Sequence, residues 1–95
     1  MIQNGQFLAV FNSAHRVMKA EDVLKKSGLT ILLIPAPRAL STDCGLAIRY
    51  NDDIYDRVLQ TLTSENILPD FIYLKDSDTH YQLIWSFNNT EVSSN

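Results

Sequence analysis

The segment Leu29–Tyr50 reads LTILLIPAPRALSTDCGLAIRY and contains two apolar runs separated by a polar loop. The first run, Leu29–Ile34, is β-branched and almost entirely apolar, which is typical of a central strand buried on both faces. The second run, Leu46–Tyr50, predicts a strand that returns after the loop. Because proline fixes φ and favours extended geometry in the preceding residue, Pro35 and Pro37 give the loop a rigid start.

A helix is expected on each side of this pair of strands. Before it, Ser13 is a candidate N-cap, Ala14–Lys26 places apolar residues at helical spacing, and Gly28 fits the left-handed position that closes a helix. After it, Asn51–Asp53 opens a second helix, since carboxylates favour the positive end of the helix dipole. The apolar residues of that second helix that point inward are expected to be Ile54, Val58 and Leu62.

Two further strands, Phe7–Phe11 and Phe71–Lys75, complete the order strand, helix, strand, strand, helix, strand. This alternation predicts an α+β fold of the ferredoxin-like kind, a βαββαβ two-layer sandwich with right-handed crossovers. Residues 80–87 alternate with a period of two and predict a fifth strand hairpinned onto the fourth. The expected sheet is antiparallel in the order 5-4-1-3-2, with both helices on one face. One face of the fifth strand is expected to carry the stripe Tyr81, Leu83, Trp85 and Phe87.

A single domain is expected over residues 1–87, with the βαββαβ core at 6–75 and the added hairpin strand at 76–87. A chain of 95 residues with 45% apolar content is long enough for one core. The polar residues 88–95 are expected to be disordered. The residues predicted to form the core are Leu8, Val10, Leu24, Ile31, Leu33, Ile48 and Val58.

Composition excludes several classes of partner. The net charge of −3 gives no general basic surface for nucleic acid. No apolar run approaches the roughly 20 residues of a membrane span, so no membrane association is expected. The first residues lack the features of a signal peptide, and one cysteine cannot form an internal disulfide. A reducing cytoplasm is therefore the expected location.

Cys44, the single cysteine, lies at the end of the polar loop. Arg38 supplies a permanent positive charge that is expected to favour the thiolate, and Ser41 supplies a hydroxyl. Gly45 allows a sharp backbone turn beside the thiol. This pattern predicts a partly accessible thiol that acts as a nucleophile or a carrier. The alternative is that Cys44 packs as a small buried hydrophobe.

Other polar residues weaken or extend this hypothesis. Asp43 disfavours a thiolate at Cys44 unless its side chain points away. His15, in the first turn of the first helix, could assist a thiol or bind an anion, or could simply be solvated. The expected topology places that turn and the Cys44 loop at opposite ends of the sheet. Arg38 and Arg49 could form an anion site or could be salt-bridged surface groups.

No metal site, cofactor site or catalytic signature is predicted. Cys44, Asp43 and a histidine have suitable donor atoms for a metal, but no ligand-spacing motif joins them. His80 is expected in a surface turn. The chain has no CxxC pair, no glycine-rich phosphate loop and no triad pattern, and no general base is evident near the thiol. Independent catalysis is therefore the least expected function.

Residues 34–49, IPAPRALSTDCGLAIR, resemble a segment of the selenium/sulfur carrier protein-like family, a family of small single-cysteine domains. That segment follows the pattern Pro-x-Pro-Arg-x-(Leu/Ile)-Ser-x-x-Cys-Gly-(Leu)-Ala-(Leu/Ile)-Arg. The resemblance covers residues 6–75 and extends to the first helix through Ser13, Ala20, Glu21 and Leu24. It implies that Cys44 holds sulfur or selenium as a persulfide or selenosulfide. The chain departs from the family at Asp43, where small hydroxyl residues are common, and the strand at 80–87 lies outside the resemblance.

The resemblance implies a carrier protein rather than an independent catalyst. Its partners would be a chalcogen donor such as a cysteine desulfurase and a downstream acceptor protein. The alternative is a non-catalytic module of ferredoxin-like fold that binds a small anion or metabolite through Arg38 and Ser41, with Cys44 structural. A third hypothesis is an interaction protein that pairs through its aromatic fifth strand. We also expect a homodimer, built through the uncovered sheet face or the C-terminal strand.

Overall fold

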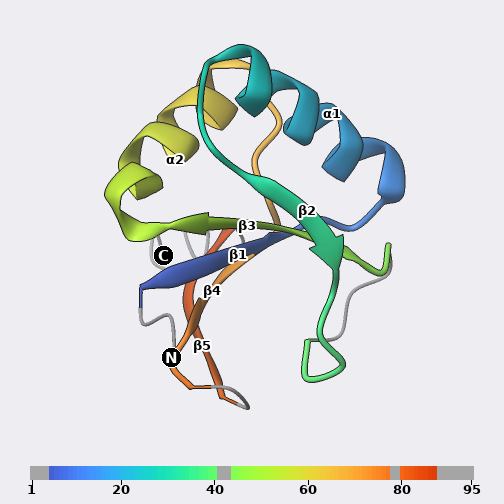
Figure 1. Ribbon diagram of the computed structural model, residues 1–95. Coiled ribbons are helices and arrows are strands. Elements are labelled where there is room, and N and C mark those ends of the chain that lie inside the picture. Colours follow the sequence, from blue (N-terminus) through green and yellow to red (C-terminus); the bar gives the residue numbers. More distant parts are fainter. Residues whose placement is uncertain (1–4, 41–43, 78–79, 88–95) are drawn as a thin grey trace, which may run out of the picture.

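The computed structural model describes residues 5–40, 44–77 and 80–87, and these residues form two helices over a five-stranded sheet (Figure 1). The disorder expected for residues 88–95 concerns a segment outside the described residues. In chain order the elements are β1 (Gln6–Val10), α1 (Ala14–Lys26), β2 (Leu32–Pro35), β3 (Leu46–Asn51), a 3-10 turn (Asp52–Ile54), α2 (Tyr55–Ser64), β4 (Phe71–Lys75) and β5 (Tyr81–Ser86).

The sheet has the order β2-β3-β1-β4-β5, and every neighbouring pair is antiparallel. Both helices cover the same face of the sheet (Figure 1). These observations confirm the α+β class, the strand order and the placement of the helices expected from the sequence. The order of elements is compatible with a ferredoxin-like sandwich. The first strand of the chain, β1, therefore occupies the centre of the sheet.

Helix α1 has the bounds that the sequence predicts, because both of its ends carry capping residues. The Ser13 hydroxyl oxygen accepts a hydrogen bond from the Arg16 backbone N–H at 3.2 Å. At the other end Gly28 has a φ of +82°, and its N–H donates to the Lys25 carbonyl at 3.0 Å. Among the described residues, neither helix is long and apolar enough to cross a membrane.

The two faces of the sheet have separate cores. The helix-face core lies between the sheet and the helices and comprises Ala9, Phe11, Val17, Ala20, Leu24, Leu29, Ile31, Ile48, Tyr50, Val58, Leu62, Ile67 and Ile72. The far-face core lies on the other side of the sheet and comprises Leu8, Val10, Leu40 and Ala47. Strand alternation explains why Leu8 and Val10 are buried away from the helices. Of the residues predicted to form the core, Leu33 is only half-buried.

The prediction of a central strand at Leu29–Ile34 is wrong. Strand β2 begins at Leu32 and lies at an edge of the sheet, where Leu32 is 49% exposed. Leu29 and Ile31 are buried in the helix-face core, but they precede the strand. Leu29 and Ile31 therefore belong to a buried connection between α1 and the sheet. The sequence pattern does not distinguish such a connection from a buried strand.

The predicted stripe of side chains on one face of the fifth strand is also wrong. Tyr73 pairs with Leu83, whereas Ile72 pairs with Trp85, so the pairing of β4 with β5 contains a bulge at Ile84. One extra residue reverses the side-chain alternation. Tyr81 consequently packs against the far-face core, and Trp85 packs against the helix-face core.

Candidate functional site

The loop that carries the cysteine extends the hairpin of β2 and β3 and folds against the far face of the sheet. The Ala36 N–H donates to the Gly45 carbonyl at 2.9 Å, which closes the base of the loop. Within the loop the Leu40 N–H donates to the Pro37 carbonyl at 3.0 Å and forms a tight turn. Leu40 is only 6% exposed and belongs to the far-face core, against which Ala36 also packs. The loop is therefore anchored by apolar contacts as well as by hydrogen bonds.

Cys44 lies at the other end of the loop and packs against the helix-face core. Its side chain is half-buried, which agrees with the partly accessible thiol expected from the sequence. The sulfur lies 3.2 Å from the Leu46 carbonyl oxygen, to which a thiol can donate. The Leu46 N–H donates to the sulfur at 3.4 Å. Among the described residues, the two polar groups that contact the sulfur thus belong to the backbone of one residue.

Gly45 makes this arrangement possible. Its φ is +72°, in the left-handed region that side-chain-bearing residues rarely adopt. A Cβ at this position would meet no atom within 4 Å, so the requirement for glycine is conformational rather than steric. The turn at Gly45 brings the two backbone groups of Leu46 back toward the preceding side chain. The importance that the sequence suggests for Gly45 therefore has a geometric basis.

The other predicted site residues remain hypotheses. Arg38 is exposed in the turn between Ala36 and Leu40, and within the described part of the chain its guanidinium forms no ion pair or hydrogen bond. Because Ala36 and Leu40 pack on the far face and Cys44 packs on the helix face, the two ends of the loop contact opposite sides of the sheet. Ser41 and Asp43 lie outside the described residues.

The expectation that the start of α1 and the cysteine loop lie at opposite ends of the sheet is wrong. Val10, the last residue of β1, pairs with Ala47 near the start of β3. The loop before β3 and the turn into α1 therefore meet at one end of the sheet, as Figure 1 shows. The physical reason is that β2 runs parallel to β1, since both are antiparallel to β3. His15 at this end is exposed.

Arg16, which was not among the residues predicted from the sequence, organises the same end of the sheet. Its guanidinium donates to the Leu68 carbonyl at 2.7 Å and to the Asn12 side-chain oxygen at 3.2 Å, and lies 3.7 Å from a carboxylate oxygen of Asp70. The hollow of about 460 Å³ beside it is lined by Asn12, Arg16, Asn66, Leu68, Asp70 and Phe87. Because its donors bind protein groups, Arg16 ties α1 to the segment before β4. The only sequence signal for this role is the position of Arg16 in α1, three residues after the N-cap.

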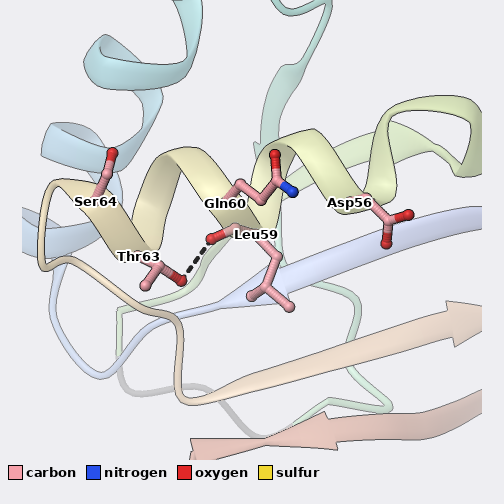
Figure 2. Close-up of a pocket in the computed structure, with 5 residues that line it drawn as sticks. All are labelled: Asp56, Leu59, Gln60, Thr63 and Ser64. Atoms are coloured by element: carbon pink, nitrogen blue, oxygen red, sulfur yellow. Dashed lines mark hydrogen bonds between the residues drawn. The ribbon is translucent and has the colours of Figure 1, made fainter.

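A second hollow, of about 400 Å³, lies along α2 and is lined by Asp56, Leu59, Gln60, Thr63 and Ser64 (Figure 2). The Thr63 hydroxyl donates to the Leu59 carbonyl at 2.7 Å, so this polar group is satisfied by the helix itself. None of the lining residues belongs to the cysteine loop. This hollow therefore adds no chemistry to the thiol.

Metal-binding clusters are absent from the described ranges, where no group of three histidine, cysteine, aspartate or glutamate side chains comes together. His80 is exposed, and its Nδ1 lies 3.0 Å from an Asp76 carboxylate oxygen. This contact belongs to the turn before β5 and lies apart from Cys44 in the fold.

Comparison with known proteins gives one match. The model of the family described as "Putative Se/S carrier protein-like" matches residues 6–74. The matched range includes α1, the cysteine loop and α2, and ends within β4. No curated protein and no solved structure matches the chain.

Proposed function

Because the chain belongs to the Se/S carrier protein-like family, we propose that it carries sulfur or selenium on Cys44, as a persulfide or a selenosulfide. The observation that carries this proposal is the setting of the thiol. Cys44 is half-buried at the end of an anchored loop, and its sulfur is held by the Leu46 backbone. Such a site presents one sulfur atom in a fixed position to a partner protein.

The loading step needs no oxidant. The Cys44 thiolate attacks the outer sulfur of a persulfide on a donor such as a cysteine desulfurase. A bond forms between the Cys44 sulfur and the transferred sulfur, the sulfur–sulfur bond of the donor breaks, and the donor cysteine leaves as a thiolate. In the unloading step an acceptor thiolate attacks the outer sulfur, a new sulfur–sulfur bond forms on the acceptor, and Cys44 leaves as a thiolate. The transferred atom keeps its oxidation state in both steps.

The surroundings of Cys44 suit both steps. The Leu46 N–H donates to the sulfur and favours negative charge on it, both when it attacks and when it leaves, whereas the Leu46 carbonyl accepts from the neutral thiol. The chain has one cysteine, so no second thiol of the same chain can release the carried atom as a disulfide forms. In this proposal Arg38, on the same loop, attracts the anionic persulfide of the donor, and Ser41 contributes a hydroxyl. A reducing cytoplasm keeps the thiol available.

Mass spectrometry after incubation with a cysteine desulfurase and cysteine tests the proposal. We expect the native protein to gain the mass of one sulfur atom, which a reducing agent removes, and the Cys44→Ser variant to gain nothing. Selenocysteine as the substrate gives the corresponding test for selenium. Alkylation of the folded protein serves as a control for access to the thiol.

Arg38 can be tested separately from Cys44. We expect Arg38→Ala to slow loading at low salt, whereas Arg57→Ala, which removes an exposed arginine from α2, leaves the rate unchanged. A native protein that is alkylated readily but never loaded would contradict the carrier function. The alternative is then a module that binds a small anion, with Cys44 structural, and Arg38→Ala should weaken that binding.

A further inference from the structure

The two edges of the sheet differ in how they are protected against pairing with another chain. Strand β2 forms one edge and ends at Pro35, which has no N–H to offer to a further strand. Strand β5 forms the other edge and reads YQLIWS, with no proline and no charged residue. Proline, charge and β-bulges are among the means by which an edge strand avoids pairing. Strand β2 has the proline, whereas β5 has the bulge at Ile84 but neither proline nor charge in residues 81–86.

The β5 edge is also where exposed apolar side chains gather. Leu83 is 49% exposed, Ile84 is 38% exposed and Phe87 is 46% exposed. The other large apolar side chains exposed in the described residues, Met18 and Leu32, lie on different elements. The bulge contributes to this exposure, because Ile84 has no pairing partner on β4. Clustered exposed apolar residues on an unpaired edge are typical of an interface.

We propose that β5 is the interface of a homodimer, in which the β5 strands of two copies pair antiparallel and form one continuous sheet. The charge of the strand argues for a second copy as the occupant. When a strand pairs with a second copy of itself about a two-fold axis, a charged residue near the axis lies close to the same residue of the other copy. Like charges in such positions destabilise the pairing. Residues 81–86 carry no charge, so the strand can pair with itself in any antiparallel register. A two-fold pairing also closes on itself and consumes the free edge of both copies.

The proposal is independent of the thiol chemistry. The residues that form the proposed interface, Leu83, Ile84 and Phe87, follow the range that the family model matches. The cysteine loop joins β2 to β3, and two strands, β1 and β4, separate β3 from β5 in the sheet. A dimer through β5 therefore leaves the loop of each copy open to donors and acceptors.

A pair of matched leucines provides the test. Leu83 on β5 and Leu32 on β2 are both 49% exposed, and they lie on opposite edges of the same sheet. We expect the native protein to be a dimer in sedimentation equilibrium. We expect Leu83→Lys to raise the dissociation constant at least about tenfold, since each copy then brings a charged ammonium group into an apolar interface. Leu32→Lys should leave the constant unchanged.

Hydrogen exchange on the native protein gives a second readout that needs no variant. The backbone amides of residues 81–86 should exchange more slowly as the protein concentration rises through the dissociation constant, and those of β2 should not change. A native protein that stays monomeric at high micromolar concentration overturns the proposal. A dimer that persists in both variants also overturns it, as does a dimer that only Leu32→Lys dissociates. An assembly of more than two copies overturns it as well. Far-ultraviolet circular dichroism of both variants checks that they are folded.

Discussion

The two faces of the sheet are buried in different ways. The helix face is covered by α1 and α2, and its core includes Leu24 and Leu62, which are fully buried. The far face has a smaller core, and among the residues that the structure describes Leu40 is its only buried member outside the sheet. Leu40 belongs to the same loop as Cys44. The element that presents the thiol is therefore also the element that covers part of the far face.

This difference couples stability to the thiol more strongly on the far face than on the helix face. A helix can lose a packing contact and still hold its place through its other contacts and its caps. The described part of the loop is anchored by the Leu40 side chain, by the Pro37–Leu40 turn and by the Ala36–Gly45 hydrogen bond. Because Cys44 packs against the helix-face core, changes there can reach the thiol through packing, but changes at the loop anchors act directly on the loop and should have the larger effect on alkylation of Cys44.

The largest effect is expected for Leu62→Ala on the helix face. Leu62 has no exposed surface, so its truncation leaves a cavity and should lower the free energy of unfolding by about 3 kcal/mol. Urea denaturation measures the loss. Under native conditions the rate of Cys44 alkylation should rise less than in the loop variant Leu40→Ala, because Leu62 belongs to the core against which Cys44 packs but not to the loop. A rise as large as in Leu40→Ala would contradict the dominant role of the loop anchors.

Leu40→Ala should have a smaller effect on stability and a larger one on the thiol. The side chain is 6% exposed in the smaller core, and its loss should lower the free energy of unfolding by about 2 kcal/mol. Because Leu40 anchors the loop, the half-buried Cys44 should be alkylated faster in the folded variant. An alkylation rate that matches Leu62→Ala would contradict the coupling between the far face and the thiol.

Gly45→Ala and Gly28→Ala form a matched pair between the loop and α1. Both glycines have a positive φ, and neither has an atom within 4 Å of an added Cβ. Each substitution should therefore lower the free energy of unfolding by about 1 kcal/mol, the cost of a left-handed conformation. Only Gly45→Ala should slow the loading of Cys44, because only that turn brings the Leu46 backbone to the sulfur. Equal loading rates in both variants would show that the turn does not matter for transfer.

The smallest effect on stability near neutral pH is expected for Tyr50→Phe. Tyr50 is 3% exposed in the helix-face core, and its hydroxyl has no hydrogen-bond partner among the described residues. Removal of an unpaired buried hydroxyl should leave stability unchanged or raise it by up to about 1 kcal/mol. A clear loss of stability in thermal denaturation would mean that the hydroxyl is bonded in solution.

The same substitution makes a prediction about alkaline pH. Burial, with a smaller contribution from Tyr55, raises the pKa of Tyr50 well above its ordinary value. In the unfolded chain the phenol ionises above about pH 10, and in the folded protein it stays neutral. The stability that depends on neutral Tyr50 is therefore present below that pH and is lost as the pH rises above it. Tyr50→Phe should lose less stability than the native protein between neutral pH and pH values above about 10.

The sequence predicted those parts of the fold that local chemistry determines. Helix α1 has a cap at each end, and its predicted and observed bounds agree. The alternation of strands and helices predicted the strand order. Two strands that are joined by a helix cannot form an antiparallel hairpin with each other. Cys44 and Gly45 could be recognised as neighbours in a tight turn, because glycine beside a polar loop indicates a left-handed residue.

The parts that failed depend on tertiary structure. An apolar run such as Leu29–Ile34 looks the same whether it forms a strand or connects a helix to one. A bulge adds a single residue at Ile84 and reverses every later side chain of β5, and no local pattern marks it. The role of Leu40 required knowledge of which face the loop covers. The shared position of the α1 start and the cysteine loop follows from the directions of β1, β2 and β3 taken together.

The central position of β1 has a consequence for the synthesis of the protein. β1 is the first strand to leave the ribosome, yet its two neighbours are β3 and β4, and β4 ends at Lys75. During translation the sheet cannot be completed until most of the chain has emerged from the ribosome. The reason is that the contacts of β1 join residues that are distant in the sequence. During this interval the cysteine loop is synthesised before the strand that completes the sheet. A nascent chain should therefore expose a thiol that is more accessible than the half-buried one in the finished protein.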